Sequence, residues 1–257
     1  MTLLVLCSAT GAPGVTTSAL TLGWVWPAAT DGRHAVVIDA DPSSSGVLPG
    51  LAQAGVPVGG GVLHLAANDA PMDLASLLGQ CVAFAPDGAS GWVLPGISDP
   101  IQAPATDAVW RALVTALPEL HEAGVDLLVD GGRLGHEHQA RALLEAADVV
   151  ALVLRPDLAS VAGAYPVLTR LVADRGPGRA TTGLLVGQGR PYTANEVARE
   201  LGLGAVAVIE RDPNAAAAVL AGIRSGRSDR SRLMASARPA AAYLAEAPFR
   251  VLTGVKR

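Results

Sequence analysis

A glycine-rich stretch near the N-terminus has the composition of a loop that binds phosphate. It follows the apolar residues 3–7 and precedes a run of helical composition. A turn between a buried strand and a helix presents backbone N–H groups and the positive end of the helix dipole to an anion. The stretch is Thr10-Gly11-Ala12-Pro13-Gly14-Val15-Thr16-Thr17, and the residues expected to bind a phosphate are Gly11, Ala12, Pro13, Gly14, Val15, Thr16 and Thr17.

The stretch departs from the full phosphate-loop pattern, G-x-x-x-x-G-K-[ST], at two fixed positions. Ala9 stands where the pattern has its first glycine, and Val15 stands where it has lysine. Gly14 and Thr16 match the second glycine and the hydroxyl residue. Taken alone, the stretch fits a tight strand-to-helix turn equally well.

Three aspartates follow apolar runs of strand length. Asp39 and Asp41 come after residues 35–38, and Asp130 comes after residues 126–129. The carboxyl ends of parallel strands lie at one edge of a sheet, where α/β proteins bind their ligands. With the Thr16 hydroxyl, the three acids form the set of ligands that a Mg²⁺–nucleotide site would need, whereas each acid by itself also fits a helix N-cap.

Short apolar runs alternate with longer segments of helical spacing, which predicts an α/β fold with a parallel sheet between two layers of helices. About seven strands and a single domain over residues 1–257 are expected. Residues 43–87 give no clear prediction because glycines and prolines are scattered through them. Residues 230–257 are expected to form a docked helix and a tail. The predicted strands are 3–7, 35–38, 92–94, 126–129, 149–154, 183–186 and 205–209, and the predicted helices are 16–26, 107–122, 138–146, 160–173, 194–201, 214–222 and 230–245.

The composition is that of a soluble protein of the cytoplasm. Half of the 257 residues are hydrophobic, 16% are charged and the net charge is −4, which argues against a surface broadly committed to nucleic acid. No apolar run reaches the roughly 18 residues that span a bilayer, so no integral membrane segment is expected. The basic residues are 18 arginines and a single lysine, Lys256.

The order and spacing of these motifs resemble the ParA/MinD family of deviant-Walker P-loop ATPases, of the SIMIBI class, over nearly the whole chain. The family loop K-G-G-x-G-K-T-[ST] corresponds to residues 10–17, and its D-x-D-P motif corresponds to residues 39–42. Its "vLPg" strand end corresponds to residues 93–96, and Asp130 begins the Walker B end. Residues 147–160 resemble a later stretch of the family.

The resemblance implies a role for each site residue. Thr16 would ligate Mg²⁺, Asp39 and Asp130 would support the metal, and Asp41 would position the attacking water. The implied cofactor is ATP or ADP with Mg²⁺, and the implied assembly is a homodimer that encloses the nucleotide.

The chain lacks both lysines of the family loop. One lysine of the family contacts the β- and γ-phosphates of its own subunit, and the other reaches across the dimer; Val15 and Thr10 stand in their places. Phosphoryl transfer depends on stabilising charge on the γ-phosphate oxygens. Nucleotide binding is therefore expected to be weak or absent, and hydrolysis negligible. Arg155, Arg190 and Arg211 follow predicted strands, but we favour surface roles for them.

The functional hypothesis is a pseudo-ATPase that serves as a localisation, scaffold or regulatory protein. Its partners would be proteins of a cell-envelope, pilus-secretion or division machinery, and it could be peripheral to the membrane through one of them. The alternative is an active ATPase for DNA partitioning or protein positioning. The basic residues 224–232 make DNA a candidate partner, but not the favoured one.

Two further hypotheses are disfavoured by the sequence. A dinucleotide-binding oxidoreductase is disfavoured because the loop lacks the spacing G-x-G-x-x-G. A C-terminal membrane-targeting helix like that of MinD is disfavoured because Pro239 and Pro248 are expected to interrupt it.

Overall fold

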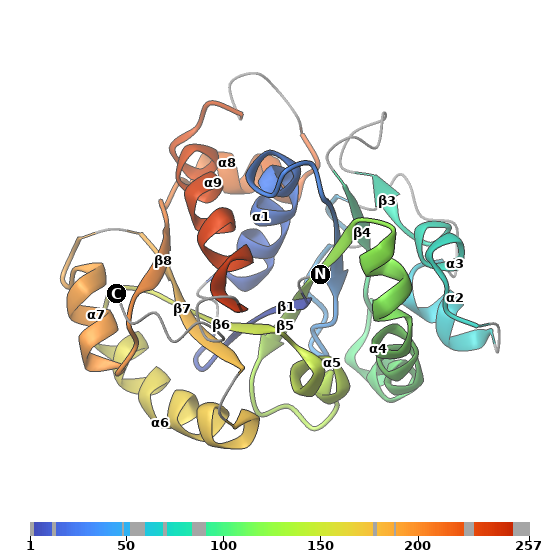
Figure 1. The fold of residues 1–257 in the computed structure, drawn as a ribbon, viewed down its shortest axis with the longest axis horizontal. Coiled ribbons are helices and arrows are strands. Elements are labelled where there is room, and N and C mark those ends of the chain that lie inside the picture. The colour runs from blue at the N-terminus through green and yellow to red at the C-terminus, as the bar shows by residue number, and fades with distance from the viewer. Residues whose placement is uncertain are drawn as a thin grey trace.

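Strands from along the whole chain join in one eight-stranded sheet (Figure 1). The computed structural model describes residues 3–11, 14–47, 49–51, 60–68, 71–83, 91–176, 179–187, 189–223 and 229–248. The strand order is β3-β4-β2-β5-β1-β6-β7-β8. The bounds are β1 Leu3–Ser8, β2 His34–Asp39, β3 Val82–Ala83, β4 Trp92–Leu94, β5 Val125–Arg133, β6 Val149–Leu154, β7 Ala180–Val186 and β8 Val206–Ile209.

The sheet is parallel except at one edge, where β3 pairs antiparallel with β4. The α/β fold with a parallel sheet is thus confirmed, and the predicted number of about seven strands is close to the eight described. The additional strand, β3, has two residues and lies in the part of the sequence that gave no clear prediction. A strand this short leaves too little alternation to be recognised from sequence.

Helices cover both faces of the sheet (Figure 1). One face carries α1 (Val15–Ala29), α8 (Pro213–Leu220) and α9 (Arg232–Ala245). The opposite face carries α2 (Val62–Ala67), α3 (Leu74–Leu78), the 3₁₀ helix η1 (Pro100–Thr106), α4 (Asp107–Glu122), α5 (Arg141–Ala146), α6 (Leu158–Arg175) and α7 (Ala194–Glu200).

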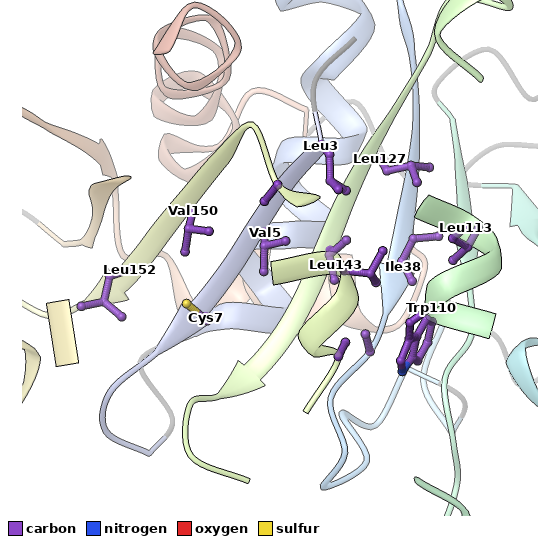
Figure 2. Packing of buried hydrophobic residues seen from close by; sticks show 14 of the residues in the cluster. Leu3, Val5, Cys7, Ile38, Trp110, Leu113, Leu127, Leu143, Val150 and Leu152 are labelled. Atoms are coloured by element: carbon purple, nitrogen blue, oxygen red, sulfur yellow. The ribbon is translucent and has the colours of Figure 1, made fainter. Parts of the chain in front are cut away.

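The central strands are buried on both sides, which is why they are nearly continuous apolar runs. Alternate residues of β1 enter different cores. Leu4 and Leu6 pack on the α1 side, whereas Leu3, Val5 and Cys7 pack on the α4 side. Figure 2 shows the second of these cores, where side chains from four strands meet those of α4 and α5.

The C-terminal segment docks as a helix, as expected, but Pro239 does not interrupt it. Helix α9 continues from Arg232 to Ala245 through this proline. Its apolar side is buried against α1 and β8, and this packing outweighs the one backbone hydrogen bond that a proline removes. The expected tail falls largely on residues 249–257, which lie outside the described residues. No helix in the described part of the chain is long and apolar enough to cross a membrane.

Candidate functional site

The loop between β1 and α1 ends in a turn that only glycine adopts easily. Gly14 has φ 103°, ψ 34° and precedes the first residue of α1, Val15. No side chain caps this helix, and its first turn holds no acidic residue. The N–H groups of Val15, Thr16 and Thr17 therefore form an uncapped, positively polarised helix end, as an anion site requires. Ala12 and Pro13, also predicted to bind phosphate, lie outside the described residues.

Two buried carboxylates lie side by side next to this helix end. Asp39 ends β2 and Asp130 belongs to β5, and their Cα atoms are partners in the parallel ladder. Their side chains are almost inaccessible, with 2% and 1% exposure. The side chain of Thr16 lies close enough to Asp130 to lower the pKa of that carboxyl group, which connects the pair to the first turn of α1.

Each carboxylate is fixed through one of its oxygens. Asp39 Oδ2 accepts hydrogen bonds from Ser45 Oγ at 2.6 Å and from the backbone N–H of Gly96 at 3.2 Å. Asp130 Oδ1 accepts from the N–H of Gly132 at 3.1 Å. The other oxygens, Asp39 Oδ1 and Asp130 Oδ2, are buried and have no hydrogen-bond partner among the described residues.

The surroundings of this pair favour a proton or a cation. Burial raises the pKa of Asp39, and the nearby charge of Asp41 raises it further, against the lowering effect of the Ser45 and Gly96 hydrogen bonds. Burial also raises the pKa of Asp130, and the charge of Asp39 adds to this effect. Two carboxylates so close cannot both ionise cheaply without a positive charge between them.

The unpaired oxygens fit a magnesium ion. Mg²⁺ takes hard oxygen ligands and is usually held by one or two carboxylates, with water and substrate phosphates completing the shell. In the described residues no group of three or more His, Cys, Asp or Glu side chains could hold a metal by itself. Asp39, Asp130 and Thr16 would therefore hold the ion together with water and a phosphate.

Asp41 lies beside this pair, against the last residues of β5. A Cβ atom at Gly132 would come within 2.4 Å of the Asp41 Cγ, and Gly132 has φ +60°, so this position requires glycine. Asp41 Oδ1 accepts from the N–H of Ser43 at 2.8 Å. The structure therefore brings together Asp39, Asp41, Asp130 and Thr16, although their roles remain predictions.

The two positions that lack lysine are occupied by packed side chains. Val15 is 7% exposed and belongs to the core between α1 and the sheet. Thr10 lies against α6, where its Cγ2 is 2.7 Å from the place of a Cβ at Gly163. Arg211 lies near Gly187 at the ends of β7 and β8, several strands from the loop.

Sequence reasoning overlooked Arg133. Strand β5 continues past Asp130 to Arg133, whose Cα pairs with Ser8, the last residue of β1. The backbone of an exposed arginine therefore lies beside the start of the loop that lacks both lysines. The available signal was its distance of three residues from Asp130, but Gly131 and Gly132 suggested that the strand had already ended.

Comparison with solved structures identifies the fold. MinD from Aquifex aeolicus superposes with a TM-score of 0.70 at 18% identity, covering 94% of this chain and 96% of that one. A ParA family ATPase from Chlorobium tepidum has a TM-score of 0.69 at 15% identity and coverages of 94% and 99%. The chain has the fold of the MinD and ParA ATPases. No model of a protein family and no curated protein sequence matches it.

The MinD and ParA fold also occurs in enzymes of other function. Cobyrinic acid a,c-diamide synthase from Mycobacterium smegmatis, with a bound ATP analog and magnesium, has a TM-score of 0.67 at 18% identity and coverages of 98% and 96%. At such identities the likeness defines the fold alone. The function of a MinD- or ParA-like chain has to be argued from its site.

Proposed function

We propose that the chain is a MinD/ParA-like pseudo-ATPase that acts as a localisation, scaffold or regulatory protein. The observation that carries the proposal is the contrast between the two halves of the site. In the half proposed to bind metal, the carboxylates of Asp39 and Asp130 are buried side by side, and the partly exposed Thr16 lies next to Asp130. The half that would neutralise the phosphates has Thr10 and Val15 where the resemblance places two lysines.

This contrast has a direct chemical consequence. The charge that develops on a transferred phosphoryl group is stabilised by metal ions and by fixed cations, and loss of a single arginine finger costs on the order of 10³ to 10⁵ in rate. A metal held by Asp39 and Asp130 would neutralise part of the charge, but the side chains at positions 10 and 15 add none. Nucleotide binding is accordingly weak or absent, and hydrolysis is negligible.

A protein that keeps this fold without turnover would work through its surfaces. MinD of Aquifex aeolicus has been solved in a complex with MinC, a cell division protein. By analogy, this chain would form a homodimer and dock a protein of a cell-envelope, secretion or division complex, in the cytoplasm or beside the membrane.

An active MinD- or ParA-type ATPase is the second candidate, and one observation favours it. The buried oxygens Asp39 Oδ1 and Asp130 Oδ2 have no partner among the described residues, so the site is incomplete without a proton or cation. Arg133 pairs with Ser8, the residue at the end of β1 where the loop begins. Its guanidinium group would supply one of the missing positive charges. In this case Asp41 would position the attacking water.

Calorimetric titration of the full chain with ADP and ATP, each with Mg²⁺, separates the two candidates when combined with a phosphate-release assay. The pseudo-ATPase predicts no release above a protein-free blank and a Kd weaker than about 100 µM, which corresponds to less than about 5.5 kcal/mol of binding free energy. Magnesium-dependent release that is abolished by Asp41→Ala and reduced by Arg133→Ala would instead establish the active ATPase. Arg111→Ala, on the exposed side of α4, is the matched control.

A further inference from the structure

Helix α6 carries a stripe of exposed side chains with the spacing of a coiled-coil seam. Leu158, Tyr165 and Val172 are 66%, 56% and 48% exposed and follow one another at intervals of seven residues. Ala162 and Thr169 lie between them and are also exposed. The resulting steps of four, three, four and three residues are those of heptad positions a and d.

The first three residues of the stripe, Leu158, Ala162 and Tyr165, line one wall of a groove between α6 and α7. The groove has a volume of about 360 Å³ and its apolar lining includes Leu158, Val161, Tyr165, Tyr192 and Val197. Glu196, Arg199 and Glu200 of α7 line the other wall. Large apolar side chains are thus exposed together along one helix, whereas single exposed ones are ordinary on a protein surface.

We infer that this stripe is the interface of a parallel, twofold-symmetric dimer in which α6 of one chain pairs with α6 of a second copy. A heptad seam is covered most completely by a helix with the same repeat, because each side chain then enters a hole formed by four residues of the partner. In the parallel arrangement every position of the stripe meets its own copy. The layers are Leu158, Ala162, Tyr165, Thr169 and Val172.

The placement of α6 on the domain decides between the parallel and the antiparallel arrangement. The buried face of α6, formed by Ser160, Val161, Ala164 and Leu168, is centred about 105° around the helix from the stripe at 100° per residue. Antiparallel pairing would put both sheets and both α7 helices on the same side of the helix pair, where they would collide. Parallel pairing puts them on opposite sides.

The charges at the rim match this arrangement. Arg170 is exposed on the flank of α6 that faces away from its own α7. In a parallel pair this flank faces the α7 helix of the second copy, where Glu196 and Glu200 line the groove. Each copy therefore sets Arg170 opposite a rim that carries two glutamates and Arg199, whose net charge is negative, and the symmetry repeats the contact.

The size of the stripe predicts a weak dimer. Helix α6 has 18 residues and is about 27 Å long, so one side of it is smaller than the roughly 800 Å² per partner of a standard interface. We expect a Kd on the order of 10 to 100 µM. Because the stripe lies on the flank of the domain and not at the loop after β1, dimerisation through it needs no nucleotide, and its failure would leave the proposed absence of ATP hydrolysis untouched.

Sedimentation of the full chain without nucleotide, from about 2 to about 200 µM, tests the inference. The expected result is a monomer–dimer equilibrium that Tyr165→Glu weakens at least about tenfold, since a charge would be buried in the central layer. Ile101→Glu and Ile223→Glu are the matched controls, because these residues are 82% and 58% exposed but lie away from α6. A monomer at every concentration, or a dimer equally sensitive to the control substitutions, overturns the proposal.

Cysteine cross-linking tests the parallel register. In a Cys81→Ser background, Ala162→Cys and Thr169→Cys should each form a disulfide-linked dimer on mild oxidation, because these positions meet their own copies; Cys7 is buried. Ala159→Cys and Ala173→Cys are exposed controls outside the stripe and should not. If the dimer forms but only the controls cross-link, the pairing is not the one inferred.

Discussion

The identity of residue 15 has the most direct influence on what the loop can bind. Val15 is 7% exposed and packs in the core between α1 and the sheet. Its backbone N–H still belongs to the open first turn of α1, so the geometry for an anion is present while the side-chain charge is missing. The binding deficit should therefore be repairable by one substitution.

Val15→Lys is expected to tighten Mg-ADP binding at least about tenfold. A charge-assisted hydrogen bond contributes roughly 1.5–3 kcal/mol, and about 1.4 kcal/mol corresponds to a factor of ten. The substitution should also lower the melting temperature, because it removes an apolar side chain from the core. Calorimetric titration measures the affinity, and Val15→Met is the control of similar length without charge. Equal affinities of the two variants would contradict a role for charge at this position.

The carboxylate pair makes stability depend on pH. Burial raises the pKa of Asp39 to about 6 and that of Asp130 to about 7, above the value of about 3.9 in an unfolded chain. The folded protein therefore binds more protons than the unfolded one between these values, so the pair's contribution to stability falls as pH rises from about 4 to about 7. Urea unfolding without metal at several pH values measures this fall.

Two changes should reduce this pH dependence. Asp130→Asn removes one of the interacting charges, and Mg²⁺ at millimolar concentration supplies the missing positive charge at neutral pH. Asp107→Asn, at an exposed position of α4, should leave the slope unchanged. A wild-type slope that neither Asp130→Asn nor Mg²⁺ alters would show that the pH dependence arises elsewhere.

Between elements, a partly buried ion pair and a buried hydrogen bond fix α1 to the edge of the sheet opposite the candidate site. Asp126 of β5 accepts a hydrogen bond from Trp26 Nε1 of α1 at 2.9 Å. Arg33, just before β2, reaches both Asp126 oxygens at 2.8 and 3.0 Å. The three residues join the first helix to two strands, so the position of the loop at the other end of α1 depends partly on them.

Asp126→Asn is expected to lower the free energy of unfolding by about 2 kcal/mol. Loss of one partner of a fully buried pair costs roughly 3–5 kcal/mol, and Arg33 is 30% exposed, so part of the cost is recovered by solvation. Urea unfolding measures the change, with Asp174→Asn, exposed near the end of α6, as the control. A change below about 0.5 kcal/mol would place this substitution among ordinary surface changes.

The elements that the sequence predicted well are those with a single dominant signal. The strand around Val5 and the strand around Val150 are buried on both faces, and a short, continuous apolar run bounded by turn residues is typical of such a strand. Helix α9 was harder, because Pro239 indicates a break unless the packing against α1 is known. Strand β3 depends almost wholly on its neighbour β4, so its own residues carry little signal.

The candidate site, too, could be predicted from the sequence only in part. The alignment of Asp39 with Asp130 could be predicted, because both follow strand-like runs and parallel strands end at one edge. The hydrogen bond from Ser45 to Asp39 and the approach of Gly132 to Asp41 depend on how loops return over the sheet. Loop paths are set by tertiary contacts, which local composition does not encode.

For the whole molecule, the missing cations bear on assembly as well as on binding. The resemblance places at position 10 a lysine that would reach the nucleotide of the other subunit, whereas Thr10 lies against α6 of its own chain. A nucleotide-dependent dimer would therefore lack its charged cross-subunit contact. Any association should depend on surfaces away from the loop, such as the α6 stripe.

We therefore expect the molecular mass of the full chain in solution to be the same with Mg-ATP, with Mg-ADP and without nucleotide. Light scattering coupled to size-exclusion chromatography, at a concentration well below the Kd expected for the α6 pair, measures this directly. The double variant Thr10→Lys/Val15→Lys is the informative comparison, because it restores both charges on the same fold. If ATP increases the mass of this variant but not that of the natural chain, the residues at these two positions explain why the natural chain does not respond to ATP. An ATP-specific dimer of the natural chain would instead show that another cation, with Arg133 the first to test, completes the site.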